Sequence, residues 1–345
     1  MSDLIVRKSG KAGYVTLNRP QALNALTHPM CLALEAAMTD WAADDDIGLL
    51  LIDAAGEKAF CAGGDIVKIY HEGKSGQVGN ALKFWRDEYR LNHAISTYAK
   101  PYVAIMDGIV MGGGVGISAH GSHRVVTERT MFAMPECAIG LLPDVGGTYL
   151  LGKMPGACGE YAGLTGARLS GADCIYAGLA DYFVPSDKLE DLQTALLETG
   201  DVMILQEFAT APNGSALEEN RVVIDTAFAQ NSVAEIIENL ESNTSDFART
   251  TLKDTLRGAP LCLKITLAAI RATRDNGTLE TALRNEYRIV STCLQDGELI
   301  EGIRAMVIDK DRTPKWQYPT LESVPQELVE RLYQPATDGD FSVDK

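Results

Sequence analysis

Two acidic residues in an apolar stretch are the first candidates for chemistry. Residues 132 to 149 read FAMPECAIGLLPDVGGTY, in which Glu136 follows one proline and Asp144 follows another. Apolar neighbours predict partial burial, which raises the pKa of a carboxyl group toward the range useful for proton transfer, and two nearby acids raise each other's pKa further. Each residue also has a plain structural interpretation, because Asp144 could cap a helix and Glu136 could form an ion pair.

Two glycine clusters are the second feature that could do chemistry. Residues 59 to 66 read AFCAGGDI and residues 107 to 118 read DGIVMGGGVGIS, each between an expected strand and an expected helix. Glycine leaves a backbone N–H open to a ligand, and two such groups that converge on one oxygen form an oxyanion hole. Either cluster alone could be an ordinary strand-to-helix turn. Residues 114 to 119 also fit a dinucleotide pattern, but no acidic residue follows at the expected distance.

The other reactive side chains lack the spacing that their chemistry needs. No histidine near Cys137 in the sequence has a spacing that indicates a Cys–His pair, and Ser118 is not in a GxSxG turn. His120 and His123 by themselves do not make a metal site. We therefore predict no metal.

Composition narrows the class of protein. The chain has 345 residues, 46% of them hydrophobic, and a net charge of -16. This acidity disfavours nucleic-acid binding and docking on anionic membranes, although a local cluster of cations can still hold phosphates. The sequence contains no apolar run of about 18 residues, so we expect no membrane-spanning helix. Seven widely spaced cysteines and a first segment without a targeting pattern lead us to expect a cytoplasmic protein, with a bacterial cell favoured.

The elements that must position these residues alternate between strand and helix. A hairpin is expected over residues 4–17 and a helix over 27–41, followed by buried strands at 47–52 and 102–106 and short strands at 124–126 and 131–133. Helices are expected over 80–98, 113–119, 261–272 and 279–292. We predict an α/β core at residues 1–185 and a helical C-terminal region at 186–345, with a frayed tail after Pro335.

Several of these motifs, in order, resemble the crotonase (enoyl-CoA hydratase/isomerase) superfamily. They are LNRPQALNAL at 17–26, AFCAGGD at 59–65, KPYVAIMDGIVMGGGVGIS at 100–118 and MPECAIGLLPDVGG at 134–147. WRDEYRLNHAI at 85–95 and the segments at 285–294 and 296–316 are similar to the 3-hydroxyisobutyryl-CoA hydrolase branch. The resemblance implies a ClpP/crotonase fold, a spiral of ββα units with a helical C-terminal region.

The resemblance also implies an acyl-coenzyme A substrate and assigns roles by motif position. The thioester oxygen would accept hydrogen bonds from the amides of Gly64 and Gly113. Glu136 matches the catalytic glutamate and would attack the carbonyl or activate water, and these two routes stay open. Asp144 matches the second acid of the hydrolase branch, and Glu88 matches its substrate-pocket glutamate.

Further residues are implied to line the substrate, with coenzyme A bound as part of it and no separate cofactor. They are Asn24, Ala25, Leu26, Ala62, Asp65 and Gly112. The expected products are coenzyme A and a small hydroxy acid from valine catabolism, with 3-hydroxyisobutyryl-CoA or 3-hydroxypropionyl-CoA as substrate. The family further suggests a homo-oligomer.

Two departures from the family pattern affect this interpretation. Enoyl-CoA hydratases carry a second glutamate where this chain has Gly116, so half of the hydration apparatus is missing. Gln21 replaces a lysine that can meet coenzyme A phosphate, which leaves Lys58, Lys68 or Arg19 as candidates. A hydratase or isomerase of the same fold, or a non-catalytic structural member of the family, are the competing interpretations.

Overall fold

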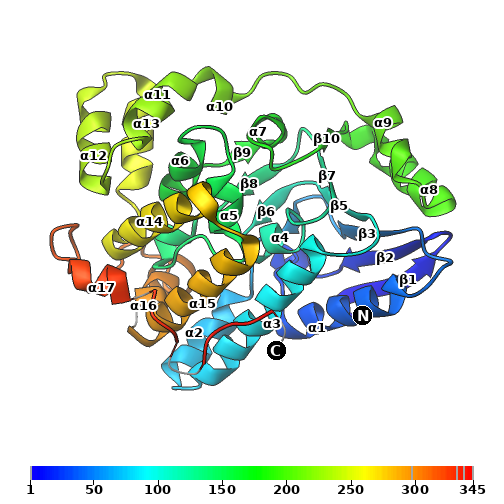
Figure 1. Ribbon diagram of the computed structural model, residues 1–345, viewed down its shortest axis with the longest axis horizontal. Helices are drawn as coiled ribbons and strands as arrows, with labels where there is room; N and C mark the ends of the chain where they lie inside the picture. The colour runs from blue at the N-terminus through cyan, green and yellow to red at the C-terminus, as the bar shows by residue number, and fades with distance from the viewer. Residues whose placement is uncertain (1, 297, 332, 337–338, 344–345) are drawn as a thin grey trace. The chain divides into compact units, whose positions relative to one another are not determined.

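The computed structural model describes residues 2–296, 298–331, 333–336 and 339–343 (Figure 1). The chain forms two compact units, one from Met1–Gly64, Arg90–Phe132 and Arg168–Glu218 and the other from Asp65–Tyr89, Ala133–Ala167 and Glu219–Lys345. Each unit takes segments from both sides of the predicted boundary at residue 185. The division of the sequence into a core and a helical region stays a prediction.

The first unit is built on a six-stranded sheet with the order β1-β2-β3-β5-β7-β10. The first two strands form the predicted antiparallel hairpin, and the remaining neighbours are parallel. The strands are β1 (Leu4–Ser9), β2 (Ala12–Leu17), β3 (Leu49–Ala54), β5 (Tyr102–Met106), β7 (His123–Val126) and β10 (Tyr182–Phe183).

Helices cover both faces of this sheet, which explains why β3 and β5 are almost continuously apolar. On one face, Leu51 and Val103 share a buried cluster with Leu192 of α8 (Leu189–Thr199). On the other face, Gly13 of β2 lies so close to α1 (His28–Ala42) that a Cβ there would sit 2.2 Å from the Trp41 ring. The predicted helix at 27–41 and the strands at 47–52 and 102–106 are confirmed.

A second sheet has the order β4-β6-β8-β9 and carries the glycine loops. Of these four strands, β8 was predicted from the sequence and the other three were not. Two or three residues are too few to show an alternating or continuous apolar pattern. The strands are β4 (Ala59–Cys61), β6 (Ile109–Met111), β8 (Met131–Ala133) and β9 (Leu169–Ser170).

The remaining helices of the first unit are short. The helix expected over 113–119 ends early, as α4 (Gly113–Gly116). The others are α7 (Gly171–Ala177), α9 (Leu205–Phe208) and α10 (Ala216–Glu219).

The second unit is mostly helical, and its centre is α14 (Pro260–Asn276), which packs on α5 (Gly147–Gly152) and α6 (Cys158–Thr165). α3 (Val78–Ser96) runs from this unit into the first. The predicted helices at 80–98, 261–272 and 279–292 are confirmed. The helix predicted over 279–292 is α15 (Leu279–Asp296). The others are α2 (Ile66–Lys74), α11 (Arg221–Phe228), α12 (Val233–Ser242), α13 (Asp246–Thr255), α16 (Glu298–Ile303) and α17 (Gln326–Arg331).

In the tail after Pro335, residues 339–343 differ from the prediction of a frayed end. Phe341 is only 1% exposed, and the side chain of Arg288 donates to the Asp340 carboxylate at 2.7 Å. The Phe341 ring packs against Tyr89 and Tyr287, and these contacts hold a segment that its position near the end of the sequence marks as frayed.

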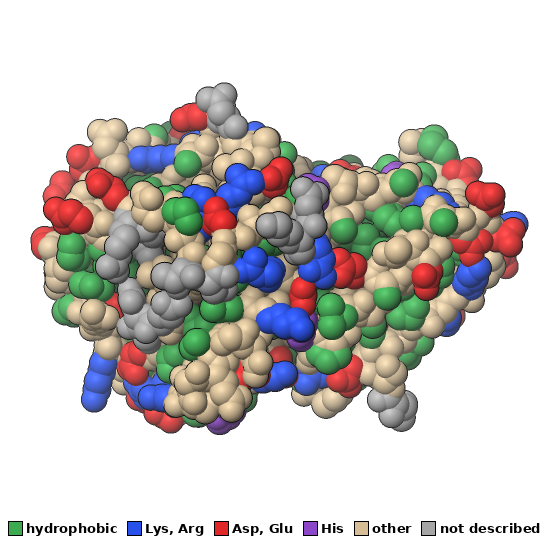
Figure 2. All heavy atoms as spheres, turned by 60° about the horizontal axis from the view of Figure 1, so that its bottom comes forward, with side chains coloured by type: hydrophobic (Ala, Val, Ile, Leu, Met, Phe, Trp, Pro, Cys, Tyr) green, Lys and Arg blue, Asp and Glu red, His purple; other side chains and the backbone are tan. Residues whose placement is uncertain are grey.

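Within the described residues, no helix is both long and apolar enough to cross a membrane. Acidic side chains recur over the face shown in Figure 2, with Lys and Arg interspersed among them. The expectations of no membrane partner and no nucleic-acid partner stay predictions.

Candidate active site

The two glycine clusters lie side by side in the first unit. β4 and β6 are parallel neighbours, so their carboxyl ends share one edge of the sheet, and each strand runs directly into its glycine loop. A Cβ built on Gly63 would lie 3.5 Å from the carbonyl oxygen of Met111, which places the loops in contact. Within the described residues, the amides of Gly64 and Gly113 donate no hydrogen bond. Two open N–H groups in adjoining loops are what an oxyanion hole requires.

The close approach of these loops requires glycine. A Cβ on Gly114 would sit 2.3 Å from the carbonyl oxygen of Cys61, a distance that no side chain tolerates. Gly63 has φ +112°, a conformation that L residues rarely adopt. The glycines therefore set the spacing between β4 and α4 as well as leaving the amides open.

The segment predicted to meet coenzyme A is fixed against the first glycine loop. Leu26 donates its amide to the Gly63 carbonyl at 2.8 Å, and Ala62 donates to the Leu23 carbonyl at 3.0 Å. The side chain of Asn24 is buried and donates to the carbonyls of Ala55 and Ala59 at 3.0 and 2.9 Å. The side-chain amide of Asn24 therefore holds this segment in place and is already engaged in hydrogen bonds.

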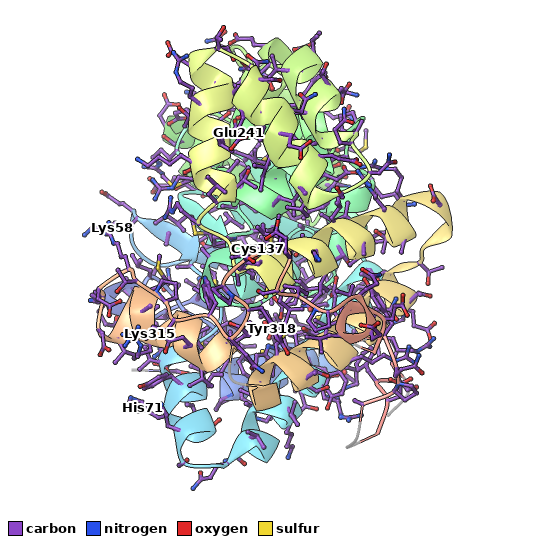
Figure 3. All side chains as sticks on the ribbon, turned by 90° about the vertical axis from the view of Figure 1, so that its left-hand side faces the viewer. Lys58, His71, Cys137, Glu241, Lys315 and Tyr318 are labelled. Carbon is purple, nitrogen blue, oxygen red and sulfur yellow. The ribbon has the colours of Figure 1, made fainter. Side chains whose placement is uncertain are left out.

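A cavity of about 270 Å³ opens beside this segment. Lys58 lines it together with Pro20 and Leu23, and the Lys58 side chain projects outward in Figure 3. Arg19 is less available, because its guanidinium donates to the Ala25 carbonyl at 2.6 Å and lies 3.6 Å from the Asp3 carboxylate. Lys68 belongs to the other unit, where it faces Glu72 at 3.8 Å. Of the three cation candidates, Lys58 is the one that lines this cavity.

The second unit brings together the three predicted acids. Glu88 on α3, Glu136 at the start of a 3-10 turn (Glu136–Ile139) and Asp144 before α5 are each at most 5% exposed. Glu136 forms no ion pair within the described residues, and the N-cap of α5 is Gly146 rather than Asp144. Both structural alternatives for these acids are therefore wrong.

Burial controls the charge of the acid cluster. Loss of solvent raises the pKa of Glu88 and of Glu136 well above the usual range, and the negative charge of Asp144 raises both further. Burial also raises the pKa of Asp144 to about 6, against a hydrogen bond from Tyr89 that favours the carboxylate. One buried oxygen each of Glu88 and Glu136 has no hydrogen-bond partner in the described part of the chain. Raised carboxyl pKa values of this kind are found more often at functional sites, where they suit a group to proton transfer.

Sequence reasoning missed two residues of this cluster. The phenol of Tyr89 donates to Asp144 Oδ2 at 2.8 Å. The Glu286 carboxylate accepts from the amides of Gly146 at 2.7 Å and Thr148 at 3.0 Å. Both residues lie inside motifs that carried the family resemblance, but nothing in local spacing shows that α3 and α15 meet the Asp144 loop.

Other candidates have structural roles. Asp65 caps α2, where its carboxylate accepts the Lys68 amide at 3.4 Å. Cys137 lies inside the second unit (Figure 3) and is 2% exposed, with Sγ 3.2 Å from the hydroxyl of Thr266. Burial raises the pKa of this thiol to about 12, so Cys137 is a core residue, as predicted. The absence of a metal stays a prediction.

The parallel strands that run into glycine loops, together with a unit of buried acids, define a crotonase-fold protein. The chain belongs to the enoyl-CoA hydratase/isomerase family, whose model matches residues 12–333. It is 41% identical to a zebrafish (Danio rerio) protein named mitochondrial 3-hydroxyisobutyryl-CoA hydrolase, over 99% of this chain and 92% of the relative. It is 42% identical to the Homo sapiens protein of that name, over 98% and 90% of the two chains.

A solved structure has the same fold throughout. It is named a carnitinyl-CoA dehydratase from Mycobacterium thermoresistibile, and it superposes with a TM-score of 0.94 at 43% identity over 98% of each chain. The predicted fold class is confirmed.

The expected cytoplasmic location is contradicted by the relatives. The zebrafish and human proteins are named as mitochondrial. The expectation came from the wide spacing of the cysteines and from the first residues of the chain, and neither feature identifies a compartment by itself.

Proposed function

We propose that this protein hydrolyses the thioester of a short 3-hydroxyacyl-coenzyme A, with 3-hydroxyisobutyryl-CoA as substrate and 3-hydroxypropionyl-CoA as the second choice. The observation that carries the proposal is identity of 41% over 99% of the chain to a protein named for that hydrolysis. The buried acids support the proposal, because both are available for proton transfer. Asp144 is not the N-cap of α5, and Glu136 forms no ion pair within the described residues.

In the proposed reaction, the thioester oxygen accepts hydrogen bonds from the amides of Gly64 and Gly113. Glu136 attacks the carbonyl to form a mixed anhydride that water then opens, or it takes a proton from water as the water attacks. Asp144 orients the substrate hydroxyl or the water and assists proton transfer to the leaving thiolate. The products are coenzyme A and the hydroxy acid, which places the reaction in valine catabolism. Coenzyme A enters as part of the substrate, and no separate cofactor is proposed.

The acid cluster favours a short polar acyl group. Glu88, Glu136 and Asp144 are all buried, and a long hydrocarbon chain placed against them would leave carboxyl groups without polar partners at a large cost. A hydroxyl on the acyl chain would instead meet one of these oxygens.

Hydration or dehydration of an acyl-CoA is the second candidate, and the name of the solved relative favours it. That chemistry needs a second carboxylate on the same water, and Gly116, at the position concerned, supplies no side chain and is buried in α4. A non-catalytic role is disfavoured because both acids and both glycine loops are present.

The test is thiol release from 3-hydroxyisobutyryl-CoA, followed with an Ellman-type reagent, beside hydration of crotonyl-CoA. The cysteines of the described chain are all buried, so the protein itself gives little background colour. We expect fast thiol release and no hydration. Hydration without thiol release would assign the chain to the second candidate, and inactivity in both assays would support the non-catalytic role.

A further inference from the structure

The Asp144 side chain is held by a phenol buried beside it. Tyr89 is 0% exposed and donates to Asp144 Oδ2 at 2.8 Å. Burial and the neighbouring acids raise the pKa of Tyr89 well above its usual value, so the phenol keeps its proton and is the donor. A hydrogen bond to a carboxylate favours the charged form of Asp144.

The backbone after Asp144 is held from another direction. Glu286 on α15 accepts the amides of Gly146 and Thr148, and Thr273 on α14 donates to the Thr148 carbonyl at 2.7 Å. The loop is thus fixed by α14 and α15, while the carboxylate is fixed by α3. Tyr89 is the contact that acts on the reacting group itself.

The Tyr89 ring is enclosed by aromatic side chains, one of which comes from the C-terminal tail. Its centroid lies 6.4 Å from that of Tyr287 and 6.0 Å from that of Phe341, both edge to face. Arg86 donates to the carbonyls of Gly339 and Asp340 at 3.1 and 3.2 Å, which ties the tail down. The tail thereby fills the space behind Tyr89.

The charged and titratable groups around Asp144 come from each element packed on it. Glu88 and Tyr89 lie on α3, Glu136 on the 3-10 turn and Glu286 on α15. Arg86 donates to the Tyr287 hydroxyl, and Arg288 donates to the Asp340 carboxylate of the tail. Tyr89 is therefore the side chain in this group that donates a hydrogen bond to Asp144.

We propose that Tyr89 is a positioning residue for Asp144, in which the phenol holds Oδ2 and leaves Oδ1 for the reacting groups, and that Phe341 keeps the ring in place. The proposal rests on the proposed hydrolase function. It concerns a residue that does not itself touch the thioester.

The variant Tyr89→Phe keeps the ring and removes the hydroxyl. We expect kcat for thiol release to fall about 10- to 100-fold with little change in KM, since one charge-assisted hydrogen bond is lost. The acid limb of the pH–kcat profile should move upward by about one pH unit, because Asp144 loses the donor that favours its charged form. The control is Tyr98→Phe, which removes a phenol that donates to the Met38 carbonyl at 3.1 Å and should leave the profile in place.

A parental rate and pH profile in Tyr89→Phe would overturn the proposal. A lower rate in Tyr89→Phe together with an unmoved acid limb and a lower Tm would also overturn it, because that result means that Tyr89 has only a packing role.

Phe341→Ala tests the role of the tail, and we expect about a 3- to 10-fold loss of kcat at unchanged KM. Parental kinetics in that variant would remove the tail from the proposal.

Failure of the proposed function can be told apart from failure of this inference. Carboxyl-carbon NMR of protein labelled in aspartate, with Asp144→Asn to assign the signal, follows the Asp144 titration without turnover. A higher Asp144 pKa in Tyr89→Phe supports the inference even if the parent releases no thiol. If the Asp144 pKa is the same in Tyr89→Phe as in the parent, the positioning role of Tyr89 is wrong, whatever the substrate is.

Discussion

At the scale of single residues, burial is the main cause of the raised pKa values of Glu88, Glu136 and Asp144. Glu136 has no cation beside it in the described chain, and one of its oxygens has no partner. This arrangement costs folding free energy, and carboxyl groups with strongly raised pKa values are more frequent at functional sites than elsewhere. The same reasoning applies to Glu88, which was predicted only from family resemblance.

Glu136→Gln should lower the rate of thiol release by about 100- to 10,000-fold, because both proposed routes need the carboxylate. Glu241→Gln is the matched control, since that residue is exposed on α12 (Figure 3) and should leave the rate unchanged. Hydrolysis at the parental rate in Glu136→Gln would exclude Glu136 from the mechanism.

The same variant should be folded and at least as stable as the parent. The pKa of Glu136 is raised in the folded state, so its favourable contribution is complete below about pH 4.5 and is lost as pH rises through the folded pKa. The stability advantage of the variant should therefore grow with pH. Chemical unfolding at pH 5 and pH 8 measures it.

At the scale of elements, the distance between β4 and α4 decides whether two amides can face one oxygen. Gly114 lies against the Cys61 carbonyl, so glycine at this position controls a backbone-to-backbone contact. A strand and a helix held this close keep the amides of Gly64 and Gly113 in a fixed relation. Fixed donors of this kind need no rearrangement when charge develops on the substrate.

Gly114→Ala should separate β4 from α4, because the new Cβ would lie 2.3 Å from the Cys61 carbonyl oxygen. We expect a loss of about 1–3 kcal/mol in unfolding free energy and a loss of rate of about a hundredfold or more. The matched control is Gly79→Ala near the start of α3, where nothing lies within 4 Å of the new Cβ. The control should be neutral or stabilising by up to about 1 kcal/mol. Parental activity in Gly114→Ala would show that the loops tolerate separation.

At the scale of the whole molecule, the buried acids set how stability responds to pH. The folded pKa values of Glu88, Glu136, Asp144 and Glu286 are all raised, with Asp144 at about 6 and Glu286 at about 8. The unfolded chain releases these protons first, so it is favoured as pH rises through the interval from about 4 to 8. Acids with lowered pKa values, such as Asp225 and Asp340, stabilise the fold above their unfolded pKa, and this contribution is lost only as pH falls through the folded pKa.

The unfolding free energy should therefore fall between pH 5 and pH 8, by on the order of a few kcal/mol. Urea unfolding followed by circular dichroism at one-unit pH intervals measures the slope. Glu286→Gln should flatten it, because Glu286 no longer ionises. A stability that stays level or rises over this interval would mean that the acids are charged in the folded protein at pH 5.

The sequence by itself determined the main strands, the long helices and the residues that match the family motifs. Continuous apolar runs such as Leu49 to Ile52 can only be buried strands or helices, and glycine clusters after them leave open amides wherever the fold places them. Glu136 and Asp144 were found for the same reason, because an acid among apolar residues is unusual enough to notice.

Only the tertiary structure decided which groups meet. The short strands β4 and β6 form because a sheet pairs them, and three residues carry no pattern of their own. Tyr89, Glu286 and Phe341 belong to segments far apart in the chain, and their contacts with each other or with the Asp144 loop depend on helix packing. Local sequence reports the preferences of one segment, whereas hydrogen bonds between distant segments arise only when burial has brought them together.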